Sequence, residues 1–203
     1  MRNPRIILIG NGAVHGNHAD FVAASEIVIR FNLCRNYKQG TGEKTDILCV
    51  VNEGYFGRKF YKTAPFVALP AAQQAPTIWF SRPALGWMQN ARWHLKDKRR
   101  KEYSQKIIRA NGLSRKAVFY LPSATQRAAA QALQACSSTP HGAMPLPSSG
   151  MTAVMYLLTQ PAYATYPLFL MGFSHQGATE HDWQAEQKYL EDQAQLGRLT
   201  FLR

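Results

Sequence analysis

The sequence has too few cysteines for a disulfide-stabilised protein and no apolar run long enough to cross a membrane. Its 203 residues include three cysteines, Cys34, Cys49 and Cys136, an odd number without C-x-x-C spacing. This pattern indicates reduced thiols and excludes a cysteine zinc site. No apolar run approaches the roughly 18 residues of a membrane helix, and residues 1–5 enter a predicted strand too early for a cleaved signal peptide. We therefore expect a cytoplasmic protein with a single domain over residues 1–203.

Acidic residues are also scarce. Asp and Glu total 12 against 24 Lys and Arg, which gives a net charge of +12. Such a balance favours an anionic partner: nucleic acid, an acidic lipid surface or an anionic substrate. The segment Trp87 to Lys116 carries most of the basic excess and begins with aromatic residues. Three interpretations stay open for it: peripheral contact with the anionic inner membrane, single-stranded nucleic-acid binding, which we expect less, and a solvated helix face.

Short apolar runs alternate with helix-like stretches along the chain. This alternation predicts an α/β fold, a single Rossmann-like domain with a mostly parallel sheet of about seven strands and helices on both faces. The expected strands are Arg5–Gly10, Glu26–Phe31, Asp46–Val51, Thr77–Ser81, Ala117–Tyr120, Pro167–Gly172 and Leu199–Leu202. The expected helices lie near Asn17–Ser25, Glu53–Tyr61, Met88–Ala110, Ser123–Cys136, Ser149–Leu158 and Asp182–Gln195, with Ser123 and Ser149 as N-caps.

Polar residues follow the first three expected strands. Asn11, Asn32 and Asn52 stand at or just beyond the strand ends, and the first strand also delivers Gly10 and Gly12. Ligands of open parallel sheets bind beyond the carboxyl ends of the strands. An asparagine amide carries a donor and an acceptor, which suits a nucleotide, although asparagine is also a common turn residue. Because an NAD enzyme would place an acid where Asn32 stands, the pattern predicts a nucleotide other than NAD.

Two other chemistries have weaker support. The run from Gly172 to Gly177 is close to the nucleophile elbow of serine hydrolases, with Ser174 as nucleophile, but its closing glycine comes one residue late. The histidines, among them His15, His18 and His175, do not form an H-E-x-x-H motif, and the sequence has no D-x-D pair. We therefore expect no metal site.

Four segments carry a resemblance to a known family. Ile6–Gly12, Val28–Asn32 and Pro147–Ala153 look like the nucleotide-binding motifs shared by animal and bacterial sialyltransferases, and His181–Glu186 is similar to their H-x-x-x-x-E motif. The order and approximate spacing agree, and the matches span most of the chain. The resemblance implies an inverting, metal-independent bacterial glycosyltransferase. It would move sialic acid or a related keto-acid sugar from a CMP-sugar donor to a hydroxyl of a glycan or glycolipid, without a further cofactor.

The resemblance also implies roles for single residues. His181 would be the catalytic base, because the pKa of histidine lies near working pH, and Glu186 would support the site. Ser148, Ser149 and Gly150, at a helix N-terminus, would bind phosphate or the donor carboxylate. The remaining nucleotide-binding residues would be Gly10, Asn11, Gly12, Asn32 and Asn52.

Departures from the family pattern leave other functions open. Gly12 is followed by Ala13 and Val14, where the family commonly has proline and serine, and the short chain leaves little room for a lid over the donor. The alternatives are a basic nucleic-acid-binding protein on a Rossmann-like scaffold, a serine hydrolase that uses Ser174, and a different nucleotide-dependent enzyme such as a methyltransferase.

Overall fold

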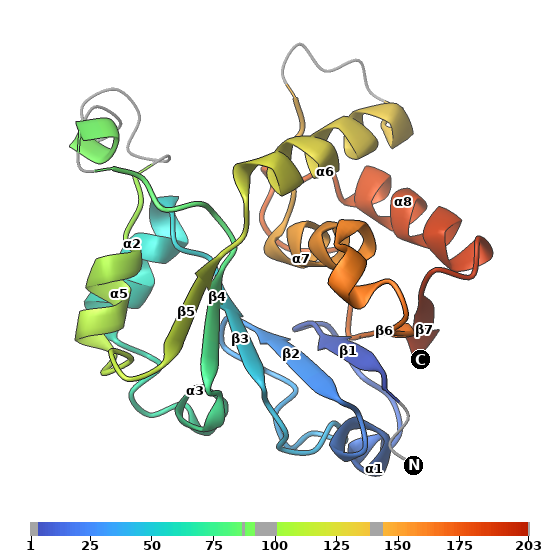
Figure 1. The fold of residues 1–203 in the computed structure, drawn as a ribbon, viewed down its shortest axis with the longest axis horizontal. Coiled ribbons are helices and arrows are strands. Elements are labelled where there is room, and N and C mark those ends of the chain that lie inside the picture. Colours follow the sequence, from blue (N-terminus) through green and yellow to red (C-terminus); the bar gives the residue numbers. More distant parts are fainter. Residues whose placement is uncertain (1–3, 87, 92–100, 139–143, 203) are drawn as a thin grey trace.

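The fold is built on one sheet in which all seven strands run parallel (Figure 1). The computed structural model describes residues 4–86, 88–91, 101–138 and 144–202. The strands are β1 (Ile6–Ile9), β2 (Ile27–Phe31), β3 (Ile47–Val50), β4 (Thr77–Phe80), β5 (Ala117–Tyr120), β6 (Leu168–Met171) and β7 (Thr200–Leu202). This sheet confirms the expected α/β Rossmann-like fold class and all seven expected strands, to within one residue at each end.

Helices cover both faces of the sheet (Figure 1). One face carries α6 (Ser123–Cys136), α7 (Ser149–Thr159) and α8 (Trp183–Gln195), and the other carries α1 (Ala19–Ala23), α2 (Gly54–Thr63), α3 (Pro70–Gln74) and α5 (Ser104–Ala110). Successive residues of a strand point to opposite faces. Ile6 and Leu8 therefore join the core beneath α7, whereas Ile7 and Ile9 pack with Val22 of α1. Because both faces are covered, the central strands are almost continuously apolar, and the exception is Arg30 of β2, which is fully buried and donates to Thr41.

The helices differ from the sequence-based expectations in three places. Met88–Ala110 is wrong as a single helix, because Glu102 bridges to Glu53 and α5 begins only at Ser104; Trp87 and residues 92–100 lie outside the described residues. The single-turn helices α3 and η2 (Pro161–Tyr163) were not expected, since such short segments show no apolar period. Both expected N-caps come one residue late, and Ser148, not Ser149, caps α7. Within the described residues, no helix is long and apolar enough to cross a membrane.

The strand order changes direction at β1. In space the strands follow the order β5-β4-β3-β2-β1-β6-β7, so the chain builds outward from β1 on one side and then crosses to the other. A crevice opens beyond the carboxyl ends of the strands where the connections diverge in this way. The loops that follow β1, β2 and β6 therefore meet at one edge of the sheet.

The loops after β1 and β6 approach each other so closely that they need glycine. The N–H groups of Gly10 and Gly12 donate to the carbonyls of Met171 and Gly172, both at 2.8 Å. The side-chain amide of Asn36 donates to the carbonyls of Gly10 and Gly12, at 2.8 and 2.7 Å. A Cβ atom on Gly10 would overlap the carbonyl oxygen of Gly172, which itself has a φ of +66°. The glycines thus fix the shape of this edge.

Replacing Gly10 by alanine tests this packing. We expect Gly10→Ala to lower the free energy of unfolding by about 1–3 kcal/mol, because the backbone of two loops must shift to admit the methyl group. Gly86→Ala is the matched control, since a Cβ atom there meets nothing within 4 Å. Urea denaturation of both variants measures the difference, and equal stability of the two would contradict the packing argument.

Candidate functional site

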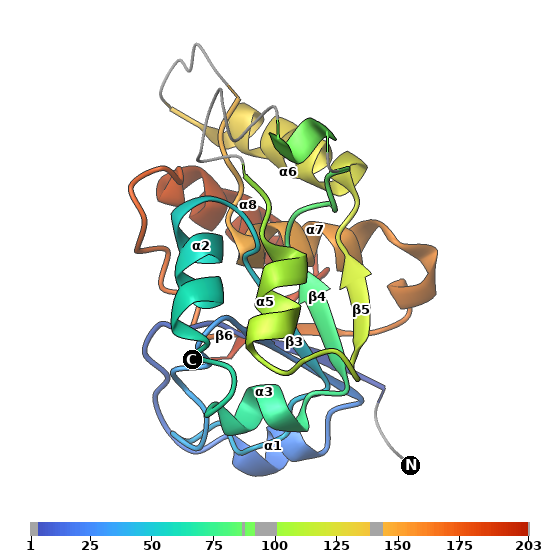
Figure 2. The same cartoon turned by 90° about the vertical axis from the view of Figure 1, so that its left-hand side faces the viewer.

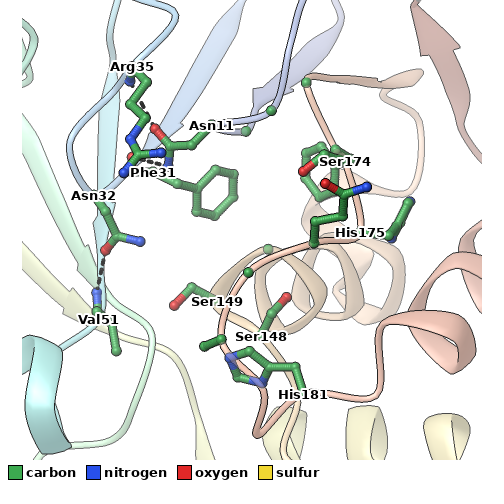
Figure 3. Close-up of a pocket in the computed structure, with 18 of the residues that line it drawn as sticks. Asn11, Phe31, Asn32, Arg35, Val51, Ser148, Ser149, Ser174, His175 and His181 are labelled. Atoms are coloured by element: carbon green, nitrogen blue, oxygen red, sulfur yellow. Dashed lines mark hydrogen bonds between the residues drawn. The ribbon is translucent and has the colours of Figure 1, made fainter.

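A pocket of about 630 Å³ lies at this edge of the sheet, bounded by the loops after β1, β2 and β6, by α2 and by the N-terminal ends of α7 and α8 (Figure 3). The structure brings together all of the expected site residues except one. Those that line the pocket are Gly10, Asn11, Gly12, Asn32, Ser148, Ser149, Gly150, His181 and Glu186.

Asn11 lines the pocket, but both ends of its side-chain amide form hydrogen bonds within the protein. Its Nδ2 donates to the carbonyl of Phe31 at 3.0 Å, and its Oδ1 accepts from the backbone N–H of Arg35 at 2.8 Å (Figure 3). The side chain therefore ties the loop after β1 to the loop after β2. Its contribution to the pocket is to hold these two walls together.

Asn32 holds the pocket wall with one end of its amide and presents the other end to the pocket. Its backbone is left-handed, with a φ of +50°. Its Oδ1 accepts a hydrogen bond from the N–H of Val51 at 3.0 Å, while its Nδ2 points toward the pocket (Figure 3). That nitrogen meets no acceptor among the described residues, so it remains a donor for a ligand.

Asn52 lies outside the pocket, contrary to expectation. It is fully buried; its Nδ2 donates to the carbonyl of Arg82 and to Glu102, and its Oδ1 accepts from the N–H of Arg82. All of its polar atoms are occupied by the protein. Asn52 therefore links the segment after β3 to Arg82 and Glu102. The sequence alone did not show that it would be buried.

The N-terminus of α7 opens into the pocket. The hydroxyl of Ser148 accepts from the N–H of Met151 at 3.1 Å, while the N–H groups of Ser149 and Gly150 find no acceptor within the described residues. A Cβ atom on Gly150 would come within 2.9 Å of the Phe173 ring, so a larger residue would close the approach to this helix end. Two free N–H groups at the positive end of an eleven-residue helix favour an anion.

Glu186 of α8 fixes this helix end from behind. Its carboxylate accepts from both the N–H and the hydroxyl of Ser148, each at 2.7 Å, and the residue is only 2% exposed. Burial raises the pKa of the Glu186 carboxyl to about 7; the two hydrogen bonds from Ser148 and the positive charge of Arg82 act in the opposite direction, and Asp182 adds to the rise. Glu186 therefore positions Ser148 and stands close to protonation at neutral pH.

His181 presents one ring nitrogen to the pocket in a fixed tautomer. Its Nδ1 lies 2.8 Å from the carbonyl oxygen of Leu146, and since a carbonyl only accepts, Nδ1 carries the proton. Burial lowers the pKa of His181; the hydrogen bond to Leu146 and the charge of Glu180 oppose this effect, whereas Arg82 reinforces it. A neutral ring with an unprotonated Nε2 can accept a hydrogen bond from a ligand hydroxyl.

Cations and aromatic rings that the sequence analysis missed complete the lining. Arg35 and Lys59 supply positive charge, and the rings of Phe31 and Phe173 meet edge to face with centroids 6.0 Å apart. Phe31 and Phe173 flank strand ends, a signal that was available in the sequence. The orientation of Lys59 on α2 was not, because it depends on how that helix packs against the sheet.

The structure gives little support at this edge to a serine hydrolase that uses Ser174. Ser174 lines the pocket, but within the described residues its hydroxyl bonds to no histidine or carboxylate, so a hydrolase nucleophile is not assembled. A smaller cavity of about 290 Å³ adjoins it and is lined by His15, His175 and Glu191, among others. In the described part of the chain, no three His, Cys, Asp or Glu side chains lie close enough together to hold a metal ion.

Comparison with known proteins gives a match over the full length of the chain. No protein-family model matches the chain. The urease operon 23 kDa accessory protein of Rhizobium meliloti (strain 1021) is 28% identical over 211 residues, which cover 100% of this chain and 94% of that protein. The chain is similar to a urease accessory protein.

This match overturns the sialyltransferase interpretation. The family assignment, the glycosyltransferase activity, and the CMP-sugar, glycan, glycolipid and membrane partners are wrong, because the full-length relative is an accessory protein of a urease operon. Three of the four motifs carry glycines, serines or asparagines at the edge of the sheet, where parallel sheets of many functions bind anions, and a fold does not fix a function. The alternative of a different nucleotide-dependent protein agrees better with the match.

The raised pKa of Glu186 predicts a dependence of stability on pH. The folded state keeps the proton up to about pH 7, whereas the unfolded chain loses it near the usual pKa of 4.5. The stabilising contribution is complete below the unfolded pKa and is lost as pH rises through the folded pKa. As pH rises over this range, we expect the free energy of unfolding of Glu186→Gln to fall less than that of the unmodified protein, because glutamine resembles the protonated carboxyl and does not titrate. Urea denaturation between pH 4.5 and pH 7.5 (roughly this window) measures it.

Glu191→Gln on the exposed side of the same helix is the matched control, and its pH profile should follow the unmodified protein. A Glu186→Gln profile that also follows the unmodified protein would show that Glu186 is ionised throughout the range.

Proposed function

We propose that this chain is a nucleotide-binding accessory protein that serves urease. The observation that carries the nucleotide assignment is the pocket at the sheet edge, which combines an anion-binding helix end with an aromatic wall. The similarity over the full length to a urease operon accessory protein supports the link to urease. We assign this function to the cytoplasm, in keeping with the three free cysteines.

The phosphate end of the pocket is formed by backbone and by cations. Ser149 and Gly150, whose N–H groups have no acceptor within the described residues, line the same pocket as Lys59 and Arg35. The one carboxylate among the described lining residues, Glu186, is held by Ser148 and has its pKa raised to about 7 by burial. A phosphate group therefore meets donors and positive charge without an opposing free carboxylate.

The rest of the pocket suits a nucleoside. Phe31, Phe56, Phe173 and Val51 offer apolar surface to a base, and a cavity of about 630 Å³ falls within the range of small-molecule sites. The Nδ2 of Asn32 donates to a base or ribose oxygen. The Nε2 of His181 can accept from a ribose hydroxyl, as follows from the fixed tautomer.

The pocket is proposed to bind a nucleotide, and no reaction is assigned to it. The sequence contains no Gly-Lys pair and hence no G-x-x-x-x-G-K-[ST] phosphate loop. In this protein the phosphate site is a capped helix N-terminus after a loop rather than a lysine-bearing glycine-rich loop. Nucleotide occupancy is the property that an accessory protein can couple to a partner, because a ligand shifts the balance between conformations that bind it unequally.

Calorimetric titration with AMP, GMP, CMP and UMP, and with the matching triphosphates, tests the nucleotide site. We expect Asn32→Ala to weaken binding by about tenfold or more, because it removes both the Nδ2 donor to the ligand and the hydrogen bond by which Oδ1 holds the Val51 N–H. Lys59→Ala should weaken binding by a similar factor and reduce its dependence on salt. Lys62→Ala, one turn along α2 and outside the pocket, is the matched control. Indifference to every nucleotide, or equal binding by all variants, would refute the site.

Urease activity in cells tests the accessory role. In a strain of the source organism that lacks this gene, we expect urease activity to fall. Expression of the Asn32→Ala, Lys59→Ala double variant should restore less activity than expression of Lys62→Ala at the same protein level, because only the former alters the pocket. Unchanged urease activity in the deleted strain would rule out the accessory role while leaving the nucleotide site to the titration.

A further inference from the structure

A positively charged surface outside the pocket lies on α2 and α5. These helices lie side by side on the same face of the sheet (Figure 2). Neither contains an acidic residue. Glu53, just before α2, is paired with Arg82, and Glu102, just before α5, is buried. The positive charges of this layer are therefore not balanced by acidic residues of their own helices.

Three cations of these helices and a pair of stacked tyrosines form what we term the α2–α5 face: Arg58, Lys106, Arg109, Tyr61 and Tyr103. The rings of Tyr61 and Tyr103 stack at 12° with centroids 6.3 Å apart. Lys106 lies 5.2 Å from the centre of the Tyr61 ring, and Lys101 lies 5.7 Å from that of Tyr103.

Arg58 and Arg109 extend the same charged surface. Burial raises the pKa of Tyr103, and the charge of Arg58 opposes this rise, which places Arg58 beside the tyrosine pair. Arg109 is exposed in the last turn of α5. Tyr55, 73% exposed at the start of α2, adds an aromatic ring to the outer side. A cationic surface with an exposed tyrosine has the composition of a protein-binding site, where Tyr and Arg are enriched.

We infer that the α2–α5 face docks an acidic surface of the urease enzyme. The inference rests on the proposed function for the identity of the partner and on charge complementarity for the place of contact. A protein partner is favoured over single-stranded nucleic acid because the face lacks a row of open aromatic rings among its described residues. Tyr103 is 8% exposed, Lys106 lies 5.2 Å from the centre of the Tyr61 ring, and Tyr55 alone is open, whereas such proteins stack successive bases on several rings.

Interferometry with purified urease of the source organism immobilised as the probe tests the inference. We expect binding that weakens with salt, and a loss of about tenfold or more in Lys106→Glu/Arg109→Glu. The control, Arg127→Glu/Lys188→Glu, makes the same change of charge on α6 and α8 and should bind within about twofold of the unmodified protein. Lys106→Gln/Arg109→Gln, a milder change, covers the case in which charge reversal prevents folding.

Several results would overturn the docking site. Equal losses in the two charge-reversed variants would show attraction by net charge alone. Tighter binding to a single-stranded oligonucleotide or to phosphatidylglycerol vesicles, lost in Lys106→Glu/Arg109→Glu, would assign the face to nucleic acid or membrane. Absence of urease binding would also overturn it. Nucleotide titration of the same proteins separates this failure from failure of the pocket, because Lys106 and Arg109 do not line it.

Discussion

The carboxylate of Glu186 on Ser148 is the contact on which the site depends. It joins α8 to the N-terminus of α7 through two hydrogen bonds in a buried place, and it leaves the Ser148 hydroxyl to cap the helix through Met151. The next two residues, Ser149 and Gly150, line the pocket. A buried carboxylate is costly unless it is paired or protonated. The two hydrogen bonds from Ser148 stabilise the ionised form of Glu186, and the raised pKa means that the carboxyl is partly protonated near neutral pH.

Arg82 supports the same helix end from the sheet side. Its guanidinium donates to the carbonyl of Pro147 at 2.7 Å and to Glu53 at 3.1 Å, and it is 5% exposed. The segment before α7 is thus tied to the end of β4. The charge of Arg82 also acts on both ionisable groups of the pocket floor, since it opposes the burial-driven rise in the pKa of Glu186 and adds to the burial-driven fall in the pKa of His181.

The sheet and most of the pocket could be predicted from the sequence, because both leave a pattern in the residues of the strands and of the loops that follow them. Strands buried on both faces must be apolar throughout, and glycine or a small polar residue must follow where their loops meet, as at Gly10 and Ser148. The same logic failed at Asn52, because the sequence does not show whether a residue after a strand turns into the crevice or behind it. It missed Lys59, whose direction depends on helix packing. It also misled about the family, since these motifs encode the geometry of an anion site and not the chemistry performed there.

Helix α2 belongs to both the pocket and the basic face. Lys59 and Phe56 line the pocket, whereas the neighbouring Arg58 stands beside Tyr103 on the outer side, and the helix packs against α5 through Tyr61. In the proposed function a nucleotide that contacts Lys59 and a partner that contacts Arg58 would act on the same short helix. If a bound nucleotide changes the affinity for the partner, linkage requires the partner to change the affinity for the nucleotide by the same factor. Because both surfaces belong to α2, such coupling would need no change of fold.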